Sequence, residues 1–239
     1  EIEEEIPDYP VNLFFTKEGY FKKITPISLR MGGEQKLKDG DVIQQSQESM
    51  NNTDLLFFSD KSQVYKTKAR DFSDTKASVL GEFIPAKLNM DEGESAIYML
   101  ATTDYSGYVF FFFENGKVAK VSLKAYETKT NRKKLTGAYS DKEKLSAIVF
   151  VNDEDSEILM RSSSGRALLL HTGAIASKTT RNTQGVAVFK QRKGHRLISA
   201  ELYHEGMLQT PQRYRTKSIP SSGALPTAEE LEGEQLELK

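Results

Sequence analysis

Four copies of one hairpin pattern recur along this chain of 239 residues, and they constrain its fold more than any other feature. In the clearest copy, an aromatic and β-branched run beginning at Tyr108 is followed by the turn residues Asn115 and Gly116 and by a second apolar run. Aromatic and β-branched side chains favour strands, and Asn-Gly readily adopts the positive φ angles of a tight turn. Each copy is therefore predicted to be a β-hairpin, and the copies span residues 11–24, 54–67, 108–121 and 157–170.

The spacing of the copies indicates a repeat architecture. The turn residues lie 43, 54 and 49 positions apart and are Gly19, Ser62, Gly116 and Gly165. A period of roughly 40–50 residues with strands in each unit is typical of propellers, in which stacked repeats bury a shared core. Further strands are predicted between the hairpins, at residues 94–101, 143–151 and 195–203, with a weaker version at 38–43. We expect an all-β, propeller-like fold with about four blades, or five if the terminal strands form another.

Charge is distributed unevenly along the chain. Residues 1–10 carry five acids and no base, and residues 219–239 carry five acids and one base, whereas residues 11–218 hold 24 acids and 32 bases. We therefore predict a basic folded domain over residues 1–210 and a polar, acidic C-terminal tail over 211–239, with at most a frayed helix from Thr227 to Leu238. A basic body suits a polyanionic partner, although the same charges also suit an ordinary solvated surface.

Basic residues recur at equivalent positions in the repeats. Residues 129–137 and 178–185 share the order Lys-Thr-polar-Arg followed by Gly, and 74–81 carry a thinner version. In three repeats a lysine lies four residues after the turn, whereas the fourth has Leu169. Lysine and arginine bind phosphates through charge, and glycine lets backbone approach closely, so we predict contacts to a nucleic-acid backbone and not to bases. The candidate residues are Lys23, Lys66, Lys120, Lys129, Arg132, Lys133, Lys134, Lys178, Arg181, Arg192, Lys193 and Arg196. The alternative is that these are solvated loops that keep the protein soluble.

No catalytic residue and no metal site are predicted. The chain has no cysteine, and its three histidines, His171, His195 and His204, lack metal-ligand spacing. It has no Gly-x-Ser-x-Gly elbow and no Walker loop. No apolar run approaches the roughly 20 residues of a membrane span. These features suit a cytoplasmic protein that does not enter the membrane.

Several of these motifs resemble one known family. They are the entry into the first hairpin with the hairpin itself, from Glu5 to Ile24, the run from Leu55 to Lys66, the segment from Phe113 to Lys120, and residues 185–200. Together they are similar to the C-terminal domain of the A subunits of bacterial type IIA topoisomerases, DNA gyrase and topoisomerase IV, over residues 1–203. The resemblance implies a β-pinwheel whose basic rim binds and bends double-stranded DNA. It also implies a heterotetramer with the ATP-hydrolysing B subunit, in which DNA cleavage lies in the rest of the A subunit or in its partner. ATP and Mg then belong elsewhere in the holoenzyme, and this chain needs no cofactor of its own.

One departure from the family pattern bears on function. Gyrases carry a Gln-Arg-Arg-Gly-Gly-Lys-Gly-like box in the first blade, and here the corresponding place is occupied by residues 28–35. Arg30, Gly32 and Gly33 fit the box, and Arg30 joins the expected DNA contacts, but Glu34 would repel phosphate. We therefore expect a DNA-guiding domain that is more like topoisomerase IV than gyrase. The alternative is a protein-interaction β-propeller without DNA binding. A propeller enzyme would need convergent acids or histidines, which the sequence does not show.

Overall fold

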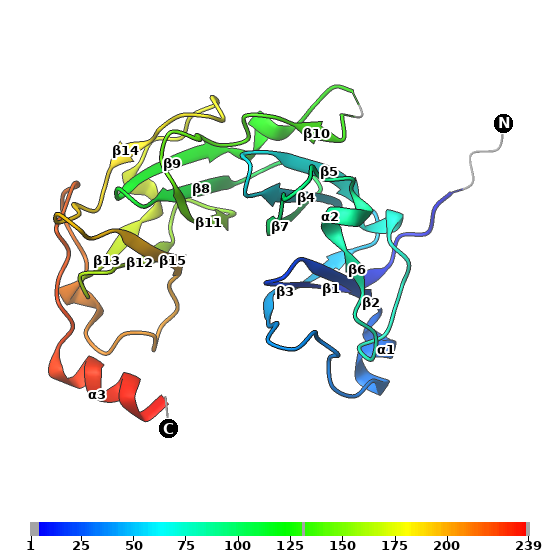
Figure 1. Ribbon diagram of the computed structural model, residues 1–239, viewed down its shortest axis with the longest axis horizontal. Helices are drawn as coiled ribbons and strands as arrows, with labels where there is room; N and C mark the ends of the chain where they lie inside the picture. Colours follow the sequence, from blue (N-terminus) through cyan, green and yellow to red (C-terminus); the bar gives the residue numbers. More distant parts are fainter. Residues whose placement is uncertain (1–4, 131, 238–239) are drawn as a thin grey trace. The chain divides into compact units, whose positions relative to one another are not determined.

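The computed structural model describes residues 5–130 and 132–237, which form four small antiparallel sheets with short helices between them (Figure 1). The chain divides into two compact units. Unit 1 contains the residues up to 105 together with 128–138, and unit 2 contains 106–127 and the residues from 139 onward. Each unit holds two of the sheets. The prediction of an all-β fold with four repeats is confirmed.

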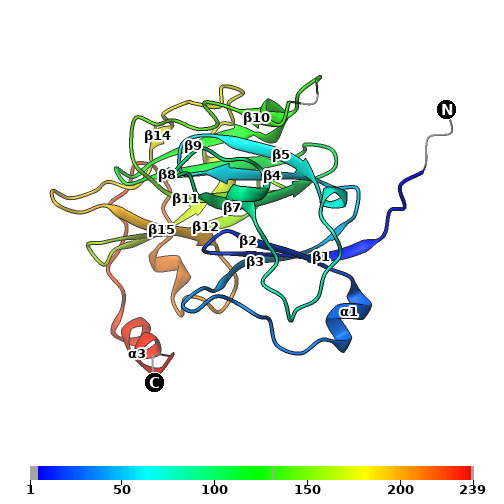
Figure 2. The ribbon, with the colours of Figure 1, turned by 45° about the vertical axis from the view of Figure 1, so that its right-hand side comes forward.

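Unit 1 contains the first two hairpins. Its first sheet has the strand order β3-β1-β2-β6 and consists of β1 (Pro10–Thr16), β2 (Tyr20–Ile24), β3 (Ile43–Met50) and β6 (Glu82–Phe83). Its second sheet has the order β10-β5-β4-β7 and consists of β4 (Asp54–Ser59), β5 (Val64–Lys68), β7 (Ala96–Thr102) and β10 (Lys134–Leu135). The short helices of this unit are α1 (Pro26–Met31), η1 (Ala69–Asp71) and α2 (Ile84–Lys87). In Figure 2, α1 lies beside the first sheet.

Unit 2 contains the other two hairpins. Its first sheet has the order β11-β8-β9-β14 and consists of β8 (Tyr108–Phe113), β9 (Lys117–Ser122), β11 (Leu145–Val151) and β14 (Val186–Ala187). Its second sheet has the order β13-β12-β15 and consists of β12 (Glu157–Ser162), β13 (Ala167–His171) and β15 (Leu197–Leu202). The helices are η2 (Leu123–Tyr126), η3 (Thr172–Ala174), η4 (Pro211–Arg213) and α3 (Ala228–Glu237).

One strand lies further along the chain than its sequence pattern predicts. The strand expected at residues 38–43 is in fact β3, which runs from Ile43 to Met50 and pairs with β1. Its sequence is rich in glutamine and serine because it is a largely exposed edge strand, so it lacks the apolar alternation that marks a half-buried strand. The side chain of Gln45 instead holds β3 by hydrogen bonds to the backbone of Met99 in β7. Its Oε1 accepts from the Met99 N–H at 2.8 Å, and its Nε2 donates to the Met99 carbonyl at 2.6 Å.

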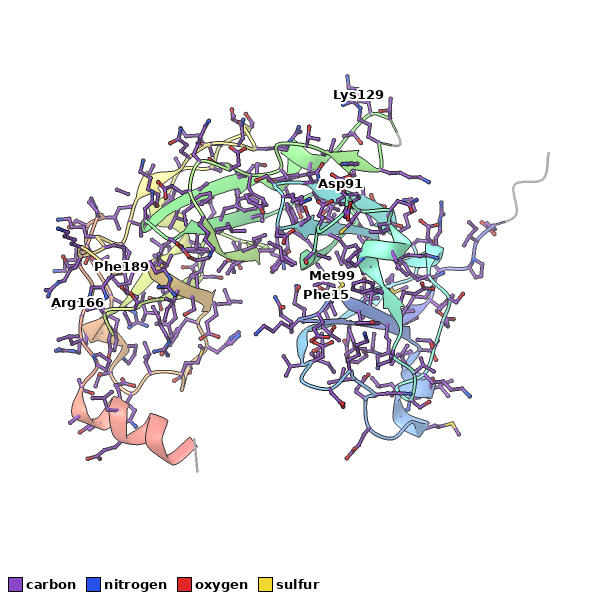
Figure 3. The ribbon with its side chains drawn as sticks, in the orientation of Figure 1. Phe15, Asp91, Met99, Lys129, Arg166 and Phe189 are labelled. Carbon is purple, nitrogen blue, oxygen red and sulfur yellow. The ribbon has the colours of Figure 1, made fainter. Side chains whose placement is uncertain are left out.

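Each unit has its own apolar core between its two sheets. In unit 1, side chains such as Phe15, Phe57 and Met99 are buried together, and Phe15 and Met99 are labelled in Figure 3. In unit 2, Phe110 and Ile158 belong to the corresponding cluster. The apolar runs of β4 and β8 are buried on both faces, which explains why they are continuous hydrophobic segments and not alternating ones.

The segment predicted to be a polar tail is partly integrated into the fourth sheet. Ala224 pairs with Ala167 of β13, and Arg215 forms a parallel bridge to Leu169. Tyr214 and Leu208 are buried against Leu159 and Leu169 in a small apolar cluster. A domain boundary at residue 210 would therefore separate Tyr214, Arg215 and Ala224 from the fourth sheet, with which they pack or pair. The predicted helix near the end corresponds to α3.

The turn glycines differ in how closely other backbone approaches them. Gly116 has φ +84°, and an added Cβ would overlap the carbonyl oxygen of Phe189. Gly165 has φ +85°, but no atom lies within 4 Å of an added Cβ. We expect Gly165→Ala to lower the free energy of unfolding by about 1–2 kcal/mol, the cost of a left-handed backbone. Gly116→Ala should cost about 1 kcal/mol more, because backbone must also move. Urea denaturation of both variants tests this, and equal losses would contradict it.

Candidate nucleic-acid interface

The basic loops precede the edge strands of the sheets. In the first three sheets a two-residue edge strand, β6, β10 or β14, pairs with the second strand of the hairpin. Among the described residues, the loops that lead into these strands are 73–81, 127–130 with 132–133, and 176–185, and they hold the Lys-Thr-polar-Arg part of the basic signatures or its thinner version. Equivalent sheets therefore present their basic loops at equivalent positions.

The glycines of these loops are only partly equivalent. Gly81 and Gly185 directly precede β6 and β14, with φ +90° and +79°, and an added Cβ would overlap the carbonyl oxygens of Phe21 and Val118. Gly137 follows β10 and has no atom within 4 Å of an added Cβ, so its equivalence with Gly185, which the sequence suggests, is wrong. The two close glycines hold the loop backbone against the hairpin strand, where only glycine fits.

In unit 1, the loop before β10 presents exposed cations. Lys129, Arg132 and Lys133 are all exposed, and Figure 3 shows Lys129 projecting from this loop. Lys134, the first residue of β10, already forms an ion pair within the protein, because its Nζ lies 3.3 Å from Oδ1 of Asp91. Hydrogen bonds from Gln63 and Lys134 lower the pKa of the Asp91 carboxyl, so this acid stays charged beside the loop. The first three cations are therefore better placed for a phosphate than Lys134.

In unit 2, the loop before β14 is fastened to the preceding hairpin. The backbone N–H of Lys178 donates to the carbonyl of Lys120 at 2.9 Å, while the Lys178 side chain is exposed. Arg181 is half-buried, and its Nη1 donates to the carbonyl of Ala125 in η2 at 3.0 Å. Arg181 therefore positions the loop, and Lys178 is its exposed cation.

A second basic segment of unit 2 lies between β14 and β15. Arg192 and Lys193 are exposed in the turn before β15. Arg196 is also exposed, with Nε 3.7 Å from Oε1 of Glu114.

Arg30 lies in unit 1, beside the first sheet. It is exposed in the last turn of α1, which ends at Met31 before the two box glycines. Arg30 and the exposed cations of the second basic segment lie at the surface, as a phosphate-binding role requires.

Lys120 overturns part of the sequence prediction. Its position in the repeat predicts a side chain in solvent, but it is 1% exposed. Its Nζ donates to the carbonyls of Thr172 and Ile175 at 3.1 and 3.0 Å and lies 2.8 Å from Oε1 of Glu154. Because all these partners are within the protein, the Lys120 side chain links β9 to the turn around η3 and is not available to contact a phosphate at the surface.

Lys23 occupies the equivalent position in unit 1 and is buried in the same way. Its side chain is 2% exposed, and its Nζ donates to the carbonyl of Ala69 at 3.0 Å and to Oδ1 of Asn51 at 2.7 Å. Asp74 lies 3.2 Å away. The expectation that Lys23 contacts phosphate is therefore wrong for the same reason as for Lys120: its donors are used inside.

Lys66 is intermediate between these buried lysines and the exposed loop cations. It is half-buried, its Nζ donates to Oγ1 of Thr128 at 3.0 Å, and it lies 5.1 Å from the centre of the Tyr105 ring. The repeated lysine thus links each of the first three hairpins to a later segment of the chain. The fourth hairpin has Leu169 at this position, where the backbone pairs with the Tyr214–Arg215 segment.

Several exposed cations lie outside the set that the sequence predicts, among them Lys217 and Lys87. Lys217 lies in the segment before Gly223, whose φ of +65° and close approach to Ala167 repeat the features of Gly81 and Gly185. Its signal is a basic run followed by glycine, which the tail-like composition around it obscures. Lys87 is in α2, which occurs in only one repeat, so no repeated pattern could have identified it.

The described residues contain no cluster of three or more potential metal-ligating side chains. Among the same residues, no helix is long and apolar enough to cross a membrane.

Comparison with known families supports the resemblance found in the sequence. The family model described as "DNA gyrase C-terminal domain, beta-propeller" matches residues 53–78 and 156–203. The A subunit of DNA gyrase from Borrelia hermsii is 25% identical over 205 residues, which cover 82% of this chain and 25% of that protein. The A subunit of DNA topoisomerase 4 from Staphylococcus aureus is 24% identical over 222 residues, which cover 90% of this chain and 27% of that protein. The chain therefore spans about a quarter of the length of these relatives.

Solved structures share the fold. The C-terminal domain of DNA topoisomerase IV aligns with a TM-score of 0.70 at 23% identity, covering 84% of this chain and 63% of that one. The E. coli ParC C-terminal domain aligns with a TM-score of 0.66 at 14% identity, covering 92% and 94%. These alignments confirm the propeller-like fold class. In sequence and in fold, the chain is similar to the C-terminal β-propeller domain of the A subunits of DNA gyrase and topoisomerase IV, as its hairpin repeats suggested.

Proposed function

We propose that this chain is the DNA-binding and DNA-guiding domain of the A subunit of a type II topoisomerase, and that it contacts the phosphate backbone without reading bases. The observation that carries the proposal is the repeated placement of exposed cations in loops that precede edge strands, including Lys129, Arg132 and Lys178. Phosphate contacts from lysine and arginine supply sequence-independent affinity. The described residues include no helix long enough to lie in a major groove and read base edges, apart from the acidic α3.

The proposal extends to the assembly. The domain works with the remainder of its own subunit and with the ATP-hydrolysing B subunit in a cytoplasmic heterotetramer, where ATP and Mg are bound outside this chain. We also propose a guiding role of the topoisomerase IV type. Glu34 is exposed beside Gly33, in the place where gyrases have a cation, and a carboxylate there disfavours a wrapped phosphate backbone.

Titration of duplex DNA across a salt series tests the proposal. The logarithm of affinity should fall by about 0.9 per phosphate contact per decade of salt, so about six contacts give a slope near −5. Two unrelated duplex sequences should give the same slope and affinity. A slope near zero, or no binding at low salt, would reject the proposal and favour a protein-interaction module. Ligating nicked circles in the presence of the domain should leave the linking number unchanged, whereas a shift would indicate gyrase-type wrapping.

A further inference from the structure

A basic groove in unit 1 lies beside the exposed loop and shares Lys133 with it. It has a volume of about 430 Å³, and four lysines from three separate segments line it: Lys66 of β5, Lys87 of α2, and Lys133 and Lys134 at the start of β10. Its volume is within the range of sites that hold small ligands. The sequence marks Lys66, Lys133 and Lys134 as candidate phosphate contacts, but it gives no sign that they lie together with Lys87, because these segments are far apart in the chain.

The four positive charges of the groove are only partly neutralised by carboxylates of the protein. Asp71 is the one carboxylate among its lining residues, and its Oδ2 already accepts hydrogen bonds from Oγ1 of Thr67 and the N–H of Lys68, both at 3.1 Å. Lys134 is paired with Asp91 at the margin, and Lys87 lies 3.9 Å from Oε1 of Glu82. Like charges gathered in a concave site raise the local potential and attract an anion.

Three of the four lysines, Lys66, Lys87 and Lys134, are also held in place, as an anion site requires. Lys66 is fixed by Thr128 and by the Tyr105 ring, and the Nζ of Lys87 lies 5.6 Å from the centre of the Phe72 ring. The Nζ of Lys134 lies 5.6 Å from the centre of the Tyr65 ring. Lysines whose ammonium groups already lie over aromatic rings lose less freedom when a ligand binds, so the groove is suited to one defined phosphate position.

We propose that this groove seats one backbone phosphate group of bound DNA and thereby sets the position of the duplex on unit 1. The inference rests on the proposed function, and it makes Lys87 a phosphate contact although no repeated motif contains it. Lys133 belongs to both the exposed loop and the groove, so a duplex that follows the loop passes the mouth of the groove.

The diagnostic variant is Lys87→Gln, with Lys17→Gln as its control. Lys17 is an exposed lysine in the β1–β2 turn of the same unit, so both variants lose one positive charge. Loss of one phosphate contact should weaken duplex binding about eightfold at 0.1 M salt and reduce the salt slope by about 0.9. Lys17→Gln should change neither value. Equal behaviour of the two variants would overturn the groove site while leaving DNA binding by the loops intact. Failure of the unsubstituted chain to bind DNA would instead reject the proposed function itself.

Pyrophosphate distinguishes DNA from a free phosphate ligand as the occupant. We expect it to shift the backbone amide resonances of Asn89 and Lys133, which line the groove, to compete with duplex DNA, and to do neither in Lys87→Gln. A different result is that pyrophosphate shifts these amide resonances, while Lys87→Gln leaves the affinity for DNA unchanged. The groove would then be assigned to a free phosphate compound. That result would overturn the proposal that DNA occupies it.

Discussion

Replacing Lys129, Arg132 and Lys133 together with glutamine is expected to weaken duplex DNA binding by about 500-fold at 0.1 M salt. All three side chains are exposed on the loop before β10. If each contacts one phosphate, each contributes about 0.9 to the salt slope, so the triple variant should lose about 2.7. The loss should be the same for every duplex sequence, because backbone phosphates carry no base information.

A matched control separates local contacts from net charge. Lys17→Gln, Lys38→Gln and Lys61→Gln combined remove the same charge from exposed residues of unit 1 outside the basic loop. Both triple variants and the unsubstituted chain are titrated by fluorescence anisotropy over the same salt series. The control should keep the salt slope of the unsubstituted chain. An equal loss in both variants would mean that only net charge matters, and a loss restricted to some duplex sequences would mean that the loop reads bases.

Lys120→Met is expected to lower the free energy of unfolding by about 3–4 kcal/mol. The substitution keeps an unbranched apolar stem but removes the ammonium that satisfies the carbonyls of Thr172 and Ile175. A buried acceptor left without a donor costs about 1–3 kcal/mol, and two are left here. The lost contact with the Tyr108 ring, whose centre lies 4.5 Å from Nζ, adds to this.

Lys144→Met provides the comparison, because its side chain is 79% exposed in the same unit. It should change the free energy of unfolding by no more than about 0.5 kcal/mol. Urea denaturation measures both values, and DNA titration of the folded variants supplies a second readout. Lys120→Met should keep the salt slope of the unsubstituted chain. Unchanged stability with a slope reduced by about 0.9 would restore Lys120 as a phosphate contact.

Local signals are sufficient for the hairpins and the basic loops. The four hairpins are predictable because turn residues and apolar runs are adjacent in the chain, and the positive φ angles of Gly116 and Gly165 agree with them. The position of β3 is not predictable in this way, because an exposed edge strand needs few apolar residues. The C-terminal segment resembles a tail in sequence because its packing depends on a few residues, such as Tyr214 and Leu208, set in a polar sequence.

The sequence by itself determined the repeat, its all-β character and the presence of basic loops, since each depends on neighbouring residues. Only the tertiary structure decided which cations face solvent. Lys23 and Lys120 look like surface lysines in sequence, yet each ends beside carbonyls 46 and 52 residues further along the chain, Ala69 and Thr172. A buried lysine is stable only where such acceptors converge on it, and that convergence is created by the packing of one hairpin against the next.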